Sequence, residues 1–299
     1  MSLSAERRAV GAVVVATFLW GGTFVAIRDS VAAIPPAALV TGRFACAGVL
    51  FTIGLAVRRR PPTARAALGG AISGVLMAAE FYFQARGLES TSAGSSAFLT
   101  CAGSLLAAFW AWLLLRQRPS GRLLLGLALA LVGSALLSLR QGLVLGAGEA
   151  WTLLGALLFG LQVVALAPFA RTADPIAIVC VQSFVAAAIL LPFAGSPASV
   201  WSAIAGAGRG DPHAGARAAA LFRFGYLAVA GSTVAPLLQV LAQRVLPPGR
   251  IGLLFALEPV FALLFALTIG REQFTPRWWL GSALILAAVL FVEWRTTDE

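Results

Sequence analysis

The sequence predicts an all-α integral membrane protein in which ten transmembrane helices form two inverted repeats of five. Three observations predict this fold class: the composition, a series of long uncharged stretches, and a similarity between the two halves of the chain. Of the 299 residues, 60% are hydrophobic and only 11% are charged, and the mean hydropathy is +0.90. A soluble domain of this length would carry many more surface charges, so the composition favours lipid as the main solvent.

The uncharged stretches give the positions of the helices. A helix needs ~20 apolar residues to cross the hydrocarbon layer. Lipid offers the backbone no hydrogen bonds, so each spanning segment is expected to be an α-helix that satisfies its own backbone groups. The first stretch is longer than the apolar core of a secretory signal, and we interpret it as a retained helix. The predicted spans are about 9–27, 36–57, 66–87, 92–115, 121–139, 147–169, 175–194, 218–242, 250–270 and 276–294.

All 22 basic residues are arginine, and they are distributed unequally between the two sides of the predicted helices. If the amino terminus lies inside, 13 arginines face the cytoplasm, with the largest group at 58–65, 8 face the opposite side, and Arg43 lies within a span. Cytoplasmic loops are enriched in basic residues, so we expect a multi-pass protein of the bacterial inner membrane with both termini in the cytoplasm. The net charge of +10 then reflects topology and attraction to anionic lipid, and membrane lipid rather than nucleic acid is the expected partner.

Several segments of the first half recur in the second half. The earlier matches share one distance and the later match has a longer one, which indicates an insertion in the second half. A longer connection at about 195–217 accounts for the difference. The matching segments are 18–21 with 157–160 and Pro36 with Pro175, each 139 positions apart, and 116–122 with 271–277, 155 positions apart.

The repetition divides the chain into a first five-helix repeat at 1–141 and a second at 142–299. Because each copy contains an odd number of helices, the second copy must cross the bilayer in the opposite direction. Two oppositely threaded copies build a site near the middle of the membrane that can be exposed to either side in turn. The repeat therefore favours a transporter over an enzyme or a receptor.

Four segments carry a family resemblance: Leu19-Trp20-Gly21-Gly22-Thr23-Phe24 in the first helix, Pro36 through Arg43 entering the second, Ala256-Leu257-Glu258-Pro259-Val260 in the ninth, and Gly270-Arg271-Glu272 followed by Gly281 near the last. In this order and spacing they resemble the drug/metabolite transporter superfamily, specifically its EamA branch. The resemblance covers nearly the whole chain and implies that both halves are EamA-like repeats with the drug/metabolite transporter fold. Within the branch, the chain is similar to the YddG-type bacterial aromatic amino acid exporters. It departs from the family pattern at Gln117, where glutamate is expected, and at Ser104, near the expected place of a proline.

Charged side chains at membrane depth are candidate substrate-binding residues, because an intramembrane charge is costly and usually functional. Arg43 lies early in the second predicted helix, and Glu80 is expected at a similar depth in the third. Two interpretations are open. The two side chains form an ion pair that joins their helices, or Arg43 binds a substrate carboxylate while Glu80 positions Arg43 or takes up a proton.

Glu258 lies in the middle of the ninth predicted helix and precedes Pro259, which lacks a backbone donor and favours a bend. A carboxyl group in apolar surroundings is a candidate for carrying a proton in a coupled cycle. Alternatively, Glu258 is hydrogen-bonded by neighbouring helices and Pro259 acts only as a hinge. A further proline at membrane depth, Pro236, offers a second bending point.

Amides and aromatic rings complete the candidate site. Gln182 lies 139 positions after Arg43, so the repeat places both side chains on faces that meet around the pseudo-twofold axis. Each glutamine alone is as suited to linking two helices as to contacting a ligand, but together they favour a partly polar cavity. Aromatic rings facing that cavity would favour hydrophobic or aromatic solutes. The candidates are Gln84, Gln162, Gln182 and Gln239, with Trp20 and Tyr82 as the aromatic residues.

Enzymatic, metal and cofactor chemistry have no candidate residues. The three cysteines fall inside predicted spans and are expected to be packing residues without a disulfide. The single histidine, His213, lies in a predicted loop, and Asp29 and Asp174 lie at span ends, so no nucleophile with its base can be assembled. The chain has no lysine and so no nucleotide-binding loop. We expect no enzyme activity, no metal and no cofactor.

The sequence therefore predicts a secondary transporter or facilitator that exports small organic solutes by alternating access through a central cavity. Aromatic and other neutral amino acids are the expected substrates, on the basis of the family resemblance and of Arg43 with its aromatic neighbours. The alternatives are export of drugs or other metabolites by proton antiport, and a membrane scaffold without transport. We expect a monomer, with a dimer as the alternative.

Overall fold

The computed structural model describes residues 3–59, 61–138, 146–207, 215–269 and 276–294. These residues contain no β-strand, and eight helical units among them are long and apolar enough to cross a membrane. The predicted all-α membrane fold is therefore confirmed. The eight units are α1 with α2 (Leu3–Gly21, Thr23–Val31), α3 (Pro36–Arg58), α4 (Ala64–Gly87), α5 (Ala93–Leu115), α7 (Ala147–Ala170), α8 (Pro175–Ala194), α10 with the π-helix η1 and α11 (Ala216–Tyr226, Leu227–Val234, Ala235–Gln243), and α12 with α13 (Pro248–Phe255, Glu258–Thr268).

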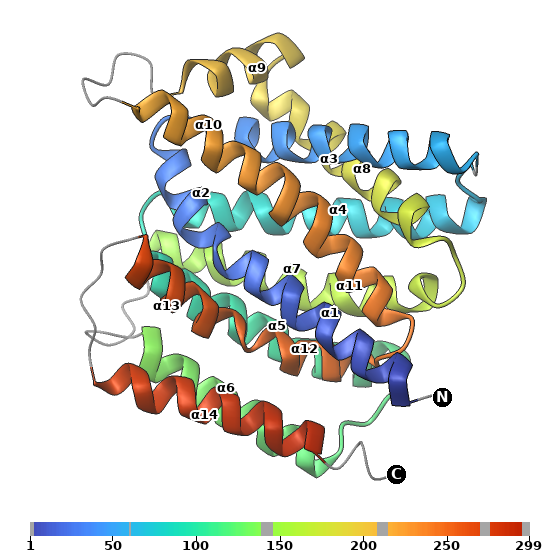
Figure 1. The fold of residues 1–299 in the computed structure, drawn as a ribbon, viewed down its shortest axis with the longest axis vertical. Helices are drawn as coiled ribbons and strands as arrows, with labels where there is room; N and C mark the ends of the chain where they lie inside the picture. The colour runs from blue at the N-terminus through green and yellow to red at the C-terminus, as the bar shows by residue number, and fades with distance from the viewer. Residues whose placement is uncertain (1–2, 60, 139–145, 208–214, 270–275, 295–299) are drawn as a thin grey trace.

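The two remaining predicted spans form shorter helices. They are α6 (Gly121–Ser138) and α14 (Arg277–Glu293), which pack against each other along one edge of the bundle (Figure 1). A further short helix, α9 (Pro197–Gly206), lies in the connection that lengthens the second half. The repeat boundary predicted at 141 and 142, the loop residue His213 and the turn at 270–272 fall outside the described residues.

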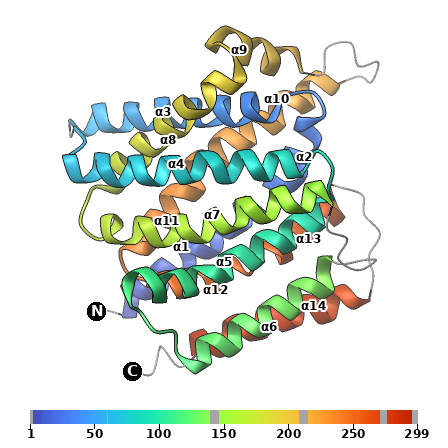
Figure 2. The ribbon, with the colours of Figure 1, turned by 180° about the vertical axis from the view of Figure 1, so that it is seen from behind.

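The two halves of the chain run in opposite directions through the bundle. The helix α1 starts at the end of the bundle where α14 finishes, whereas α7, the first helix of the second half, starts at the other end (Figure 1). Each later helix of the second half is likewise antiparallel to its counterpart in the first half (Figures 1 and 2). The inverted threading predicted from the odd helix number is thus seen directly.

The bundle has one side of interrupted helices and one side of continuous helices. The units α1–α2, α10–η1–α11 and α12–α13 each change direction or helical form within the span, and they pack on one another toward the viewer in Figure 1. The continuous helices α4, α5 and α7 form the opposite side (Figure 2). Interruptions inside a span are tolerated only where other protein groups satisfy the freed backbone, so the interrupted side is a place to look for function.

Each interruption has a local chemical cause. The break between α12 and α13 falls at Ala256 and Leu257, directly before Pro259, which lacks the backbone N–H that would continue the helix. The break between α1 and α2 falls at Gly22, where the hydroxyl of Tyr226 donates a hydrogen bond to the carbonyl oxygen of Leu19 at 2.6 Å. At Gly22 the backbone is therefore held by a neighbouring helix, α10, whereas at Ala256 and Leu257 it is held by hydrogen bonds within its own turn.

Small residues bring the continuous helices close together. A Cβ atom added at Gly70 of α4 would lie 2.6 Å from the carbonyl oxygen of Ile178 in α8, and one added at Gly74 would lie 2.7 Å from the carbonyl oxygen of Gln182. Any larger residue would force these backbones apart. The Gly-x-x-x-Gly spacing of α4 therefore sets a backbone-to-backbone contact with α8, the usual means of close packing in membranes.

Candidate functional site

Arg43 lies at the junction of the two halves, in the first third of α3. It is 1% exposed, and its Nε atom donates a hydrogen bond to the hydroxyl oxygen of Ser232 in η1 at 2.6 Å. The guanidinium carbon lies 4.6 Å from the ring centre of Phe81 and 5.5 Å from that of Phe44. The Nη2 atom of Arg43 has no hydrogen-bond partner among the residues that the structure describes. A buried cation is thus held on one side and left with donor capacity on the other.

The π-helix η1 presents Ser232 because of Pro236. In η1 each N–H reaches back five residues, as Ala235 does to the carbonyl oxygen of Ala230. Pro236 has no N–H to offer to the next carbonyl in this register, that of Gly231. The freed oxygen of Gly231 instead accepts a hydrogen bond from Trp20 Nε1 at 2.9 Å. Trp20 is therefore a structural clamp between α1 and η1.

Two carboxyl groups complete a charged cluster with Arg43. Glu80 in α4 and Glu258 at the start of α13 are each 4% exposed, and the Oε2 atom of each has no hydrogen-bond partner in the protein. Glu80 lies within electrostatic range of both Arg43 and Glu258. No ion pair joins Arg43 to Glu80 in the described part of the chain. The cluster therefore holds opposite charges near one another without direct contact, and part of its hydrogen-bonding capacity is unused.

The glutamines form a separate neutral network. Gln239 Nε2 donates to Gln162 Oε1 at 2.9 Å, and Gln162 Nε2 donates to Ser73 Oγ at 2.8 Å. The Ser73 hydroxyl donates to Gln182 Oε1 at 2.7 Å, and Gln182 Nε2 lies 3.0 Å from the sulfur of Met77. The five side chains are 0% exposed and link α11, α7, α4 and α8. The geometry of this network is that of interhelical links, and the Oε1 atom of Gln239 is its one oxygen without a partner among the described residues.

The charged cluster and the amide network occupy repeat-related positions. Gln182 lies 139 positions after Arg43, and the same distance relates Phe159 to Trp20, whose rings are in edge-to-face contact at 5.9 Å. Between α4 and the unit η1–α11 the sequence separation is 159 positions, and residues at this separation are of the same or similar type. These pairs are Ser73 with Ser232, Glu80 with Gln239, and Gln84 with Gln243. Each half thus contributes a serine that holds the arginine or glutamine of the other half.

Two predicted residues lie apart from both clusters. Tyr82 is half-buried and contacts Phe83 at 5.6 Å between ring centres, and Phe83 stacks on the partly exposed Trp151. Gln84 is 6% exposed, and its Oε1 atom has no hydrogen-bond partner. The described contacts tie neither side chain to Arg43. The remaining predicted residues all belong to the charged cluster, to the amide network or to the helix elements that hold them.

Sequence reasoning missed the residues that hold the candidates in place. They are Ser232 and Gly231 in η1, and Ser73 in the amide network. A comparison of the third and eighth predicted spans, at a sequence separation of 159 positions, would have found both serines. The side chain of Ser104, one of the departures from the family pattern, is outside the described residues. In the part of the chain that is described, no three His, Cys, Asp or Glu side chains gather as a metal site requires.

The charged cluster is not part of the main cavities of the described structure. Five cavities in the described structure lie at the ends and flanks, and Arg43, Glu80 and Glu258 line none of them. A cavity of about 300 Å³ between α2, α10 and α13 reaches Gly22 and Tyr226, beside the interruptions of two helices. The charged cluster therefore lies apart from these five cavities.

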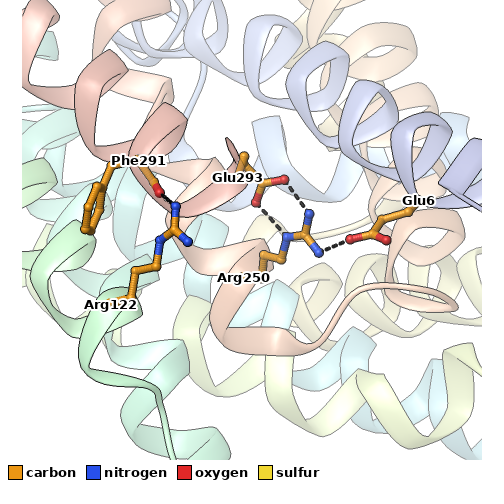
Figure 3. A network of polar contacts seen from close by, with 5 residues as sticks. All are labelled: Glu6, Arg122, Arg250, Phe291 and Glu293. Atoms are coloured by element: carbon orange, nitrogen blue, oxygen red, sulfur yellow. Dashed lines mark hydrogen bonds and ion pairs between the residues drawn. The ribbon is translucent and has the colours of Figure 1, made fainter. Parts of the chain in front are cut away.

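One end of the interrupted side is held by an ionic contact. Arg250 at the start of α12 pairs with Glu293 of α14, with nitrogen-to-oxygen distances of 2.5 and 2.6 Å, and with Glu6 of α1 (Figure 3). Beside it, Arg122 donates to the carbonyl oxygen of Phe291 and lies over that ring (Figure 3). At the opposite end, Arg223 of α10 lies 3.8 Å from Asp29 of α2. The two ends are therefore closed by different helices.

The fold and the buried polar centre define a multi-pass helical transporter built from two related halves. Residues 7–139 and again residues 146–294 match the EamA-like transporter family, and the chain belongs to this family. An uncharacterized transporter of Archaeoglobus fulgidus is 27% identical over 279 residues, covering 93% of this chain and 83% of the relative. One from Synechocystis is 27% identical over 301 residues, covering 93% and 87%. A crystal structure that is 17% identical covers 99% of both chains with a TM-score of 0.73, which supports the fold.

Proposed function

We propose that this transporter exports aromatic and other neutral amino acids across the bacterial inner membrane. The observation that carries the proposal is the buried cluster of Arg43, Glu80 and Glu258, in which one guanidinium nitrogen and one oxygen of each carboxyl group lack a partner. An unpaired polar atom costs about 1–3 kcal/mol when it is buried. A zwitterionic amino acid would supply both missing partners at once.

Each end of such a solute matches one part of the cluster. The α-carboxylate would accept hydrogen bonds from the free end of the Arg43 guanidinium, a strong charge-assisted contact. The α-ammonium group would donate to the free oxygens of Glu80 and Glu258. Phe44 and Phe81 already lie against the guanidinium, so an apolar side chain would meet aromatic surface. The cluster therefore favours a small neutral solute with both charges and an apolar body.

Alternating exposure of this cluster would follow from the inverted halves. The interrupted helices α1–α2, α10–η1–α11 and α12–α13 converge on the cluster and offer three places where a span can bend. Two of them are tied by Trp20 through the carbonyl oxygen of Gly231. We propose that bending at Pro259 and at η1 opens one end while the other stays closed, with both termini on the cytoplasmic side.

A second candidate is export of cationic drugs or metabolites by proton antiport. The observation that favours it is the excess of carboxyl groups, since Glu80 lies within electrostatic range of both Glu258 and the single arginine, Arg43. A cation or a proton would balance that excess, and Glu258 is the candidate proton carrier. In this case the solute needs no carboxylate.

Counterflow in proteoliposomes separates these candidates. Vesicles loaded with unlabelled phenylalanine are expected to take up labelled phenylalanine and tryptophan, whereas vesicles loaded with phenethylamine, which lacks the carboxylate, are not. Uptake of labelled phenethylamine into vesicles loaded with phenethylamine, without exchange of phenylalanine, would support the cation exporter. Absence of flux for every solute, in protein that is folded and monodisperse, would point to a scaffold.

A further inference from the structure

The guanidinium of Arg43 is restrained from three directions. Its Nε atom is bound to the hydroxyl of Ser232, its face lies on the ring of Phe81, and the backbone of Gly231 lies beside Nη2. A Cβ atom at Gly231 would come within 2.9 Å of Nη2 and of the Thr23 methyl group. Space for the guanidinium therefore depends on a glycine at that position.

The contact with Ser232 determines which edge of the guanidinium is free. A guanidinium can hold a carboxylate along its side, through Nε and one terminal nitrogen, or at its end, through the two terminal nitrogens. Ser232 occupies Nε, so only the end remains, and Nη2 at that end has no partner. The hydroxyl thus blocks one binding geometry and supports the other.

We propose that Ser232, presented by η1, is a positioning residue that fixes Arg43 for end-on recognition of a substrate carboxylate. This inference rests on the proposed function, since it concerns the same carboxylate. Pro236 frees the carbonyl of Gly231, Trp20 binds it, and the resulting π-helix places Ser232 against Arg43. Residues on three helices therefore act on the substrate through one hydroxyl group. Ser232 itself need not touch the solute.

The repeat provides a matched control for this role. Ser73 is the counterpart of Ser232, 159 positions earlier, and it holds Gln182 where Ser232 holds Arg43. Both serines are 0% exposed, and both lie in a helix that packs against the other half. Removal of the Ser73 hydroxyl costs hydrogen bonds to Gln182 and Gln162, whereas removal of the Ser232 hydroxyl costs the one to Arg43, so the control is the more severe change in hydrogen bonding. Only the removal at Ser232 affects a group that recognises a carboxylate.

The experiment compares Ser232→Ala with Ser73→Ala in two assays. In proteoliposome uptake, we expect Ser232→Ala to raise the KM for phenylalanine about tenfold, because a hydrogen bond to a charged group is lost, and to leave kcat within about twofold. Ser73→Ala is expected to leave that KM within about twofold. Ser232→Thr, which keeps the hydroxyl, is expected to restore much of the affinity. Gly231→Ala, which pushes on Nη2, is expected to raise KM without removing the hydroxyl.

The second assay does not depend on the transported substrate. Binding of phenylacetate to detergent-purified protein, read as a saturable shift in melting temperature, is expected in the wild type, to weaken about tenfold in Ser232→Ala and to persist in Ser73→Ala. Failure of the wild type to carry phenylalanine, with this binding pattern intact, would refute the proposed substrate and keep the role of Ser232. Equal effects of the two alanine variants, an unchanged Ser232→Ala, or no phenylacetate binding in the wild type would overturn the inference.

Discussion

The middle of the bundle contains two repeat-related clusters with opposite chemistry. Around α3 and η1, a serine of the second half holds Arg43, and Glu80 lies nearby with a free oxygen. Around α8 and α4, a serine of the first half holds Gln182, and the place of Glu80 is taken by Gln239. One cluster is charged and incompletely paired, whereas the other is neutral and joined into a continuous hydrogen-bonded chain.

The difference indicates that the two clusters have different roles. The neutral network joins three continuous helices, α4, α7 and α8, to α11 of an interrupted unit. The charged cluster takes Arg43 and Glu80 from the continuous helices α3 and α4 and meets the interrupted units at η1 and α13, and part of its hydrogen-bonding capacity is unused. Buried polar groups that are fully paired make a structure rigid, whereas unpaired groups need a partner from outside. We therefore expect the two clusters to respond differently to the same type of substitution.

The largest effect is expected from removing the one basic residue of the charged cluster. Arg43→Gln gives the first half the residue that the second half already has at Gln182. It is expected to reduce kcat/KM for phenylalanine about 100-fold, since a charge-assisted contact is lost, while the melting temperature stays or rises because an unpaired buried charge is removed. Counterflow and thermal melting measure the two quantities. Arg58→Gln, near the exposed end of α3, is the control, and equal loss of activity in both variants would contradict the comparison.

The next effect concerns the excess carboxyl group. Glu258→Gln is expected to lower substrate accumulation driven by a pH gradient about tenfold while counterflow exchange continues, because a group that carries a proton is needed only for net coupled movement. Parallel measurements with and without the imposed gradient separate the two modes. Glu89→Gln, at an exposed position after α4, is the control. If gradient-driven uptake is the same in Glu258→Gln and wild type, Glu258 does not couple protons and its role is structural.

A substitution in the neutral network tests the other side of the comparison. Gln162→Leu removes the residue between Gln239 and Ser73, and is expected to lower stability by about 1 kcal/mol, with kcat/KM for phenylalanine within about threefold of wild type. The loss is seen as a lower apparent Tm in detergent. Gln84→Leu lies outside the network and is expected to have a smaller effect on Tm. A large loss of transport at normal stability would instead assign Gln162 to the substrate.

The helical plan was predictable because it depends on properties that sequence displays directly. Long uncharged stretches and the segments at 18–21 and 157–160 define spans and repeats whatever their partners are. Charged residues at membrane depth, such as Arg43 and Glu258, stand out for the same reason. The predicted positions of the spans therefore agree with the helices that the structure describes.

The finer organisation of the site depends on contacts between distant helices. The sequence does not reveal that Pro236 leaves the carbonyl of Gly231 to Trp20, because that requires the positions of α1 and η1. The correspondence of Ser73 to Ser232 was hidden because the connection containing α9 changes the sequence separation of the repeats from 139 to 159 positions. Nor does hydropathy distinguish a paired glutamine from an unpaired glutamate.

The smallest effect is expected at the ends of the interrupted helices. Arg250 links α12 to α1 through Glu6 and to α14 through Glu293 (Figure 3). Arg223 links α10 to α2 through a longer and more exposed contact with Asp29. Arg250→Gln is expected to lower stability by about 0.5 kcal/mol at low salt, and the difference from wild type should shrink as salt rises. Melting of both variants across a salt series provides the measurement, with Arg223→Gln expected to change less. If Arg250→Gln alters substrate affinity rather than salt-dependent stability, this contact acts on the charged cluster, and the comparison between the charged cluster and the neutral network must be revised.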